Sequence, residues 1–190
     1  MTEIVNLKAY ANAAASELLV MIDLQDFYRD KLHAEHGIAV ERSLENCRRA
    51  IRHARSVGIP LAYTRLSCET ASRWIHGLEP KRSDMVFDRS SPSCYASPYF
   101  EEIVSGVERF SMAGLMAETV CVATAIDAAH RRHAMNFLDD ASVSSGRGIV
   151  DGTIAHRLTV DMLSLFAQPI ATSQWMTATS HRNMQGRGHG

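Results

Sequence analysis

The chain has 190 residues, of which 46% are hydrophobic and 22% are charged, and its formal net charge is -1. This composition is typical of a globular domain with one core, and the near-zero charge excludes strong attraction to nucleic acid or an anionic membrane. No apolar run is long enough to cross a bilayer, and no secretory signal is visible, so we expect a cytoplasmic protein. We treat 1–190 as one domain, with an N-terminal arm at 1–16 and a tail at 181–190.

Strand and helix patterns alternate along the chain. The apolar run 17–24 predicts a strand buried on both faces, and 40–58 predicts an amphipathic helix that ends at Gly58. Further strands are predicted at 59–66, 85–87, 109–115, 133–141 and 168–173, and further helices at 97–107, 118–132 and 151–167. This alternation predicts an α/β fold in which a mostly parallel sheet carries helices on both faces.

Reactive side chains follow the carboxyl ends of three predicted strands. Asp23 ends the first strand, and Arg89 comes just after the third. The fourth strand runs through Gly114 into the loop that opens the helix carrying Cys121. Because ligands bind at the carboxyl edge of such a sheet, we expect Asp23, Arg89 and Cys121 to lie close together.

These three residue types suit nucleophilic catalysis. A thiol at a helix N-terminus feels the positive end of the helix dipole, so we expect the pKa of Cys121 to be lowered. A nearby carboxylate can take the thiol proton and return it to a leaving amine, while a cation holds both groups in place. Backbone N–H groups at the helix start can form an oxyanion hole. The pattern predicts acyl transfer from an amide through a thioester.

Structural roles are the alternatives for the same residues. A buried cysteine is often a small core residue, an aspartate after a strand is often a cap, and Arg89 suits a solvated loop. Cys94 is a rival thiol. Its loop has no obvious helix behind it, so we expect a structural or substrate-lining role. The four cysteines, Cys47, Cys68, Cys94 and Cys121, have no CxxC or metal-finger spacing and are expected to be reduced.

Three segments resemble the motifs of the isochorismatase-like cysteine hydrolases: LLVMIDLQDFY, VFDRSSPSCYASPYF and AGLMAETVCVATAIDA. The resemblance covers the chain from about Glu17 to Ser173. It implies a Rossmann-like, three-layer fold with a six-stranded parallel sheet, and a Cys/Asp/Lys triad. It also implies metal-independent hydrolysis of a C–N bond in a small amide, imide or carbamoyl compound. Cys121 takes the nucleophile position and Asp23 the acid/base position.

The sequence departs from this family in two places. Arg89 stands where the family has lysine, and arginine keeps the positive charge but cannot shuttle a proton. The loop from Gly114 to Cys121 is one residue longer than the usual pattern. The resemblance implies a cis peptide at Met116–Ala117 or Ala117–Glu118, so Met116, Ala117 and Glu118 are the expected oxyanion-hole region.

The remaining site residues are expected to bind substrate. Gln25 follows Asp23, and Phe27, Trp74 and Tyr95 are expected to wall an apolar pocket, with core packing as the alternative for each aromatic ring. The nicotinamidase branch of the family binds metal through histidines after the second strand, where this chain has only His76. We therefore expect neither a metal nor another cofactor, and we expect the pairs His33/His36 and His130/His133 to be surface residues.

Two other functions stay open at this point. One is vinyl-ether hydrolysis of an isochorismate-type substrate, which does not need the cysteine. The other is a non-catalytic, oligomeric binding protein that lost the family lysine. A homo-oligomer is expected in either case, because the family implies one and the outer helices carry the apolar residues Met162, Leu165 and Phe166.

Overall fold

The computed structural model describes residues 16–69, 72–146 and 149–186, with side chains described as far as residue 180. Its centre is a parallel sheet of six strands in the order β3-β2-β1-β4-β5-β6. The strands are β1 Glu17–Ile22, β2 Leu61–Leu66, β3 Met85–Arg89, β4 Arg109–Gly114, β5 Ala134–Ser142 and β6 Gln168–Ile170. The predicted fold class and strand count are confirmed.

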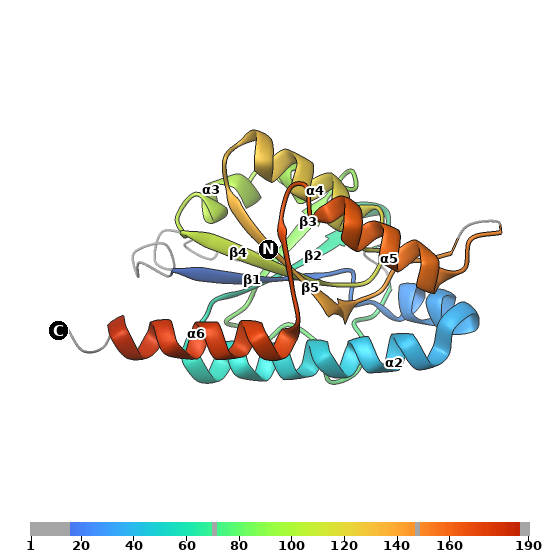
Figure 1. Cartoon of the computed structure of the whole chain (residues 1–190), viewed down its shortest axis with the longest axis horizontal. Helices are drawn as coiled ribbons and strands as arrows, with labels where there is room; N and C mark the ends of the chain where they lie inside the picture. Colours follow the sequence, from blue (N-terminus) through green and yellow to red (C-terminus); the bar gives the residue numbers. More distant parts are fainter. Residues whose placement is uncertain (1–15, 70–71, 147–148, 187–190) are drawn as a thin grey trace.

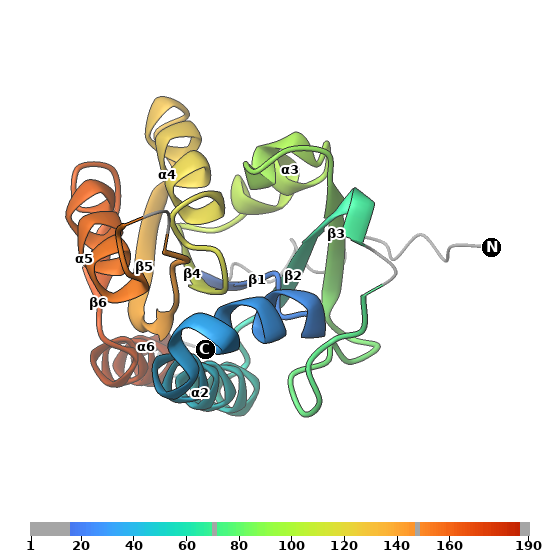
Figure 2. The ribbon, with the colours of Figure 1, turned by 90° about the vertical axis from the view of Figure 1, so that its right-hand side faces the viewer.

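Helices cover both faces of the sheet and complete three layers. The long helix α2 (Asp26–Val57) and the C-terminal helix α6 (Thr172–Gly186) lie side by side on one face (Figures 1 and 2). The other face carries α3 (Phe100–Val104), α4 (Val120–His130) and α5 (Gly152–Leu163). Every connection between successive strands except that from β2 to β3 includes at least one of these helices, as is usual for parallel pairing.

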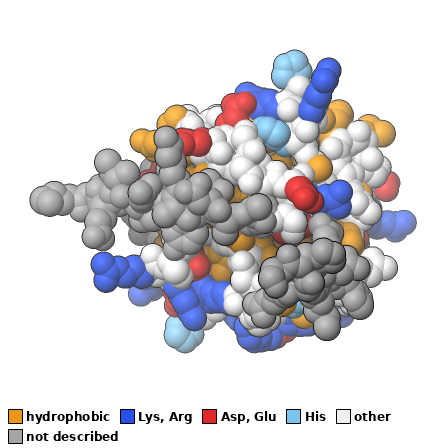
Figure 3. Space-filling model, turned by 90° about the vertical axis from the view of Figure 1, so that its left-hand side faces the viewer, with side chains coloured by type: hydrophobic (Ala, Val, Ile, Leu, Met, Phe, Trp, Pro, Cys, Tyr) orange, Lys and Arg blue, Asp and Glu red, His pale blue; other side chains and the backbone are white. Residues whose placement is uncertain are grey.

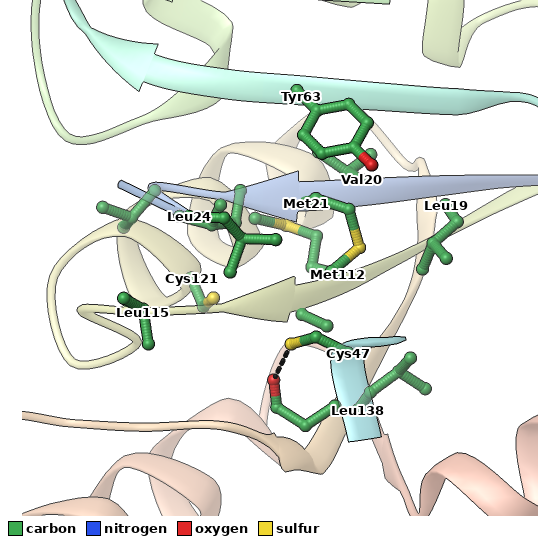
Figure 4. Packing of buried hydrophobic residues seen from close by; sticks show 14 of the residues in the cluster. Leu19, Val20, Met21, Leu24, Cys47, Tyr63, Met112, Leu115, Cys121 and Leu138 are labelled. Carbon is green, nitrogen blue, oxygen red and sulfur yellow. Dashed lines mark hydrogen bonds between the residues drawn. The ribbon is translucent and has the colours of Figure 1, made fainter. Parts of the chain in front are cut away.

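The core is centred on β1, whose residues are all buried. Leu19, Val20 and Met21 contribute to a cluster that includes Met112 of β4 and Tyr63 of β2 (Figure 4). Each large apolar side chain buried in this way stabilises the fold by about 1.5–3 kcal/mol. The residues that follow β1 at the carboxyl edge of the sheet are therefore attached to a fully buried strand.

Helix α2 is longer than predicted, because it begins at Asp26 rather than at residue 40. A kink at His36, with φ -146° and ψ 39°, separates its two parts. The first part is rich in charged residues and carries Gly37 near the kink, so its apolar periodicity is weak. His36 is held in place from outside the helix, since its Nε2 atom accepts a hydrogen bond of 2.9 Å from the N–H of Gly152.

The C-terminal prediction is wrong in two respects. The last strand ends at Ile170 rather than at residue 173, and the expected tail from 181 begins inside α6, which runs to Gly186. Trp175 anchors this helix: it is fully buried, its indole N–H donates to Glu17 over 3.2 Å, and its ring meets the His53 ring at 5.4 Å. Residues 1–15 of the expected arm lie outside the described residues.

The surface agrees with the composition. On the face shown in Figure 3, basic and acidic side chains are interspersed, as a net charge of -1 predicts. Among the described residues, no helix combines the length and apolar character that a membrane span needs.

Candidate active site

Asp23 follows β1 at the carboxyl edge of the sheet. Its backbone has a positive φ of 48°, and its N–H donates to the carbonyl of Thr64 on β2 over 3.0 Å. A left-handed conformation at a residue other than glycine costs about 1 kcal/mol, and such strain is typical of functional sites. On the other side of β1, Ile22 pairs with Gly114 of β4. A side chain at Gly114 would collide with the Ile22 carbonyl oxygen, so glycine lets the two strands meet beside Asp23.

Asp23 and Arg89 form a buried bidentate ion pair. Arg89 Nη1 and Nη2 donate to the two carboxylate oxygens of Asp23 over 2.7 and 2.5 Å, and both side chains are 1% exposed. The remaining guanidinium edge is also used, because Nε donates to the carbonyl of Pro92 over 3.1 Å. Burial by itself lowers the pKa of Arg89, but the hydrogen bonds and charge of Asp23 outweigh it, so the pKa lies above its usual value. The pair is a fixed, charged unit.

Cys121 is the second residue of α4 and is fully buried. Figure 4 draws it in the same buried cluster as Leu24 and Leu115. Burial raises the pKa of its thiol well above the usual value of 9.0, and nearby Cys94, Asp23 and Glu118 raise it further. Arg89 acts in the opposite direction. The charges of Asp23 and Arg89 both act on the Cys121 thiol, and all three residues lie at the carboxyl edge of the sheet, where β1, β3 and β4 end.

The predicted lowering of the Cys121 pKa is therefore wrong. A helix N-terminus typically stabilises a negative charge by 0.3–1 kcal/mol, roughly, whereas full burial removes the water that solvates a thiolate. In addition, the positive charge of Arg89 is already matched by Asp23. The raised pKa keeps the Cys121 thiol protonated near pH 7.

Thr124 joins Cys94 to the helix that carries Cys121, a contact that the sequence motifs did not predict. Thr124 and Cys94 are both fully buried, and the N–H of Cys94 donates to Thr124 Oγ1 over 3.0 Å. Thr124 lies one turn after Cys121 on α4, so this bond fastens the loop behind Arg89 to the helix of the thiol. Burial also raises the pKa of Cys94. The spacing of three residues between Cys121 and Thr124 was a usable signal, because it places both on one helix face.

The backbone of Met116, Ala117 and Glu118, where the oxyanion hole was expected, differs from the prediction. All peptide bonds in the described residues are trans, including the two bonds proposed as cis, and Met116 makes the turn with a positive φ of 58°. The N–H of Ala117 is occupied, since it donates to the carbonyl of Val143 over 3.0 Å. The N–H of Cys121 has no hydrogen-bond partner in the described part of the chain. Cys121 therefore offers an oxyanion donor in its own backbone, whereas Ala117 does not.

Two of the four expected substrate residues lie next to Asp23. The N–H of Gln25 donates to the carbonyl of Asp23 over 2.7 Å, and Gln25 pairs with Trp74 in an antiparallel bridge. Gln25 Nε2 also donates to the carbonyl of Ser72 over 3.0 Å, so the buried side chain holds the segment of Trp74 over the sheet edge. Phe27 is 49% exposed and packs edge-on against Tyr28.

The hydroxyl group of Tyr95 lies at the other end of α4 from Cys121. It bonds to His133 Nδ1 over 2.7 Å, and the Arg131 guanidinium lies 4.5 Å from the Tyr95 ring centroid. Both partners follow the C-terminal end of α4, opposite to Cys121. The structure therefore does not bring the Tyr95 hydroxyl to the thiol. Tyr28, which is buried and acts electrostatically on Arg89, is closer to the ion pair.

Histidines were not expected to bind metal. Within 16–69, 72–146 and 149–180, no group of three or more His, Cys, Asp or Glu side chains is arranged to hold a metal ion. His36 accepts from Gly152 and His133 bonds to Tyr95, so these two rings make structural contacts.

The burial of Cys121 predicts its reactivity in the free protein. At pH 7, iodoacetamide should modify the exposed Cys68 well before Cys121. Because the pKa of Cys121 is raised, its thiolate fraction and its alkylation rate should keep increasing as the pH rises past 9. A Cys68→Ala variant removes the exposed thiol, and mass spectrometry of its peptides separates Cys121 from Cys47 and Cys94. A rate that already levels off below pH 8 would contradict the burial and charge described above.

Comparisons with known proteins agree with this fold. The family model described as Isochorismatase domain matches residues 17–174. A putative isochorismatase from Burkholderia xenovorans LB400 superposes with a TM-score of 0.78 at 22% identity, covering 88% of this chain and 89% of that one. A cysteine hydrolase from Pseudomonas syringae pv. phaseolicola 1448A gives 0.76 at 15% identity, with 88% and 94% covered. N-carbamoylsarcosine amidase from Thermoplasma acidophilum gives 0.63 at 19% identity, with 83% and 96% covered. No curated protein sequence matches.

Proposed function

We propose that this chain, which belongs to the isochorismatase family of hydrolases, is a cysteine-dependent hydrolase of a C–N bond in a small amide, imide or carbamoyl compound. The single observation that carries the proposal is the Asp23–Arg89 ion pair beside the buried thiol of Cys121. The similar fold of an amidase, N-carbamoylsarcosine amidase, supports the same reaction class. The four free cysteines support action in a reducing compartment such as the cytoplasm.

The proposed mechanism assigns one task to each group. As the Cys121 sulfur attacks the substrate carbonyl carbon, the thiol proton passes to Asp23 and a C–S bond forms. The N–H of Cys121 donates to the developing oxyanion, and the charge of Arg89 stabilises it. The C–N bond then breaks, and Asp23 returns the proton to the leaving nitrogen. Water hydrolyses the thioester, Asp23 takes one water proton, and the thiol regains its proton from Asp23.

Arginine at position 89 can act as the cation in this mechanism without transferring a proton. The guanidinium stays charged throughout, so it cannot take a proton from the thiol or give one to the leaving group. Its bidentate contact instead keeps the Asp23 carboxylate fixed next to the sulfur. In this proposal Arg89 supplies the positive charge that lysine supplies elsewhere in the family, and Asp23 alone transfers protons.

A panel of small substrates tests the proposal. Primary amides, cyclic imides and N-carbamoyl compounds are incubated with the protein, and ammonia or amine release is measured. Isochorismate is included, with pyruvate release as its readout. C–N cleavage in at least one class supports the proposal. Cleavage of isochorismate alone would favour the vinyl-ether alternative, and no turnover of any class would favour a binding protein.

Replacing Asp23 by asparagine should remove the proton acceptor without changing the size of the side chain. We expect turnover to fall by about 10²–10⁴-fold, the usual contribution of a general base. Alkylation of Cys121 at a fixed pH should become faster, because the charge of Asp23 raises the pKa of the thiol and its removal leaves the charge of Arg89 unopposed. Asp88→Asn is the matched control, since Asp88 is exposed, pairs with Arg65 over 2.6 Å and neighbours Arg89. If Asp23→Asn retains both turnover and alkylation rate, Asp23 has only a structural role.

A further inference from the structure

A groove opens beside the outer edge of β5, at the point where β6 ends. Strand β6 pairs with β5 only from Asn136 to Leu138, whereas β5 continues to Ser142. A cavity of about 260 Å³ lies beside this last part of β5, between α2 on one face of the sheet and α5 on the other (Figure 2). A second cavity of about 400 Å³ adjoins the first, because both are lined by Asp139, Asp140, His156 and Arg157. We call the two cavities together the β5 groove.

The walls of the β5 groove are fixed by hydrogen bonds within the chain. Beyond Leu138, carbonyl groups of β5 accept hydrogen bonds from side chains of α2 and α5. These bonds run from Ser43 to Ser142, from Asn46 to Asp140 and from His156 to Asp139, over 3.1, 2.8 and 3.0 Å. The Asp140 carboxylate is held as well, since its Oδ1 atom accepts from the N–H of Thr172 over 2.8 Å. A preformed hollow of this kind is typical of small-molecule sites.

Charged side chains of both signs line the β5 groove. Arg42 borders only the smaller cavity and Asp161 only the larger one, while Asp139 and Arg157 border both. In the described part of the chain, none of these four side chains forms an ion pair within 4 Å. The groove therefore has a positive end at Arg42 and a negative end at Asp161, and its charges are not neutralised by one another.

These charges fit a small molecule that carries one negative and one positive group. A guanidinium can bond a carboxylate through two parallel N–H groups, and a carboxylate accepts hydrogen bonds from an ammonium group. A ligand with a single charge would leave one end of the groove unpaired. Ala39 and Val143 add apolar wall, against which a short carbon skeleton can pack. A free amino acid has all three parts.

We propose that the β5 groove binds a free amino acid at a place separate from the candidate active site, and that binding is transmitted to the loop from Gly114 to Cys121. Neither Cys121 nor its partners Asp23 and Arg89 line the groove. The site is therefore additional to the hydrolytic one.

Val143 connects the β5 groove to the loop that carries the nucleophile. It lines the groove, and its N–H donates to the carbonyl of Gly114 over 3.1 Å. Its own carbonyl accepts from the N–H of Ala117 over 3.0 Å. A ligand that packs against Val143 restrains the strand end to which the loop is bonded, so the loop should open less often when the groove is occupied.

Isothermal titration calorimetry of the full chain tests the binding. Glycine, L-leucine, L-glutamine and γ-aminobutyrate are the probes, and at least one of them should bind. The tightest probe is then compared with the matching carboxylate without the amino group, and with the matching amine without the carboxylate. Each should bind about 10-fold more weakly or worse, because one charge-assisted contact is lost. The proposal is overturned if no probe binds, or if either singly charged compound binds as well as the amino acid.

Single substitutions locate the site. Arg42→Gln and Asp161→Asn should each weaken binding by about 10-fold, since each removes the charge at one end of the groove. Arg52→Gln is the matched control: Arg52 is exposed on α2, pairs with Glu45 over 3.2 Å and does not line the groove, so the affinity should not change. Cys121→Ala should also bind normally. Binding that is lost in Cys121→Ala but kept in Arg42→Gln would place the ligand in the candidate active site and overturn the proposal.

Hydrogen exchange followed by mass spectrometry tests the transmission. At saturation, the bound amino acid should slow exchange in the peptide from Gly114 to Cys121 of the wild type. The same concentration should have less effect on Arg42→Gln, because less ligand is bound. Unchanged exchange at full occupancy would overturn the transmission to the loop. None of these measurements depends on the hydrolytic activity.

Discussion

Replacing Cys121 by alanine should abolish turnover while leaving the fold intact. Loss of a catalytic nucleophile typically reduces kcat by roughly 10⁴-fold or more, since no covalent intermediate can form. The change removes one buried sulfur atom, which should cost about 1 kcal/mol of unfolding free energy by comparison with a buried methylene. Turnover by ammonia release and unfolding in urea separate the two effects. A stable but inactive variant is the expected result.

Two further cysteine variants act as controls for this experiment. Cys68→Ala changes an exposed thiol and should leave turnover unchanged. Cys94→Ala changes the other buried thiol near the ion pair, and it should retain most of the activity if Cys121 is the nucleophile. Mass spectrometry of digested wild-type protein trapped with a slow substrate should show the acyl group on the peptide that contains Cys121. Near-normal turnover by Cys121→Ala would exclude the covalent mechanism, and loss of activity only in Cys94→Ala would transfer the role to Cys94.

Replacing Arg89 by alanine should affect both stability and catalysis. The change leaves the Asp23 carboxylate buried without its cation, and breaking a buried ion pair from one side typically costs about 3–5 kcal/mol. Turnover should fall by about 10²–10³-fold as well, the usual loss when one electrostatic contact to the transition state is removed. Urea denaturation and ammonia release measure the two losses in the same preparation.

The Arg89→Lys variant separates the effect of the positive charge from the effect of the two parallel hydrogen bonds to Asp23. Lysine is the family's usual residue and keeps the positive charge, but it cannot bond both carboxylate oxygens in parallel or reach Pro92 with the same geometry. We expect it to recover much of the stability and a measurable part of the turnover. An Arg65→Ala control removes a partly exposed arginine that pairs with Asp88, and it should change neither quantity by much. Full activity in Arg89→Ala would remove Arg89 from the mechanism.

The sheet was predictable because its signals are local. The apolar run of β1, the stop at Gly58 and the alternation of strand and helix are all visible in the sequence. Helix α6 was not predictable in the same way. Its sequence is polar around one tryptophan, and it is fixed mainly by contacts with residues far away in the chain, such as Trp175 with Glu17. The same reason applies to the first part of α2, whose kink is held by Gly152.

The candidate site was predictable in position but not in electrostatics. The parallel topology brings Asp23, Arg89 and Cys121 to one edge, and motif resemblance points to the same residues. The pKa of Cys121 depends on how completely the fold covers it, which no local pattern records. The hydrogen bond from Ala117 to Val143 is likewise a tertiary contact, and it is what removes Ala117 from the oxyanion hole.

The short outer strand β6 has a consequence for how the protein behaves at high concentration. It has only three residues, and the middle one, Pro169, has no N–H to offer a further strand. An edge of this kind resists the strand-by-strand growth that leads to fibrils.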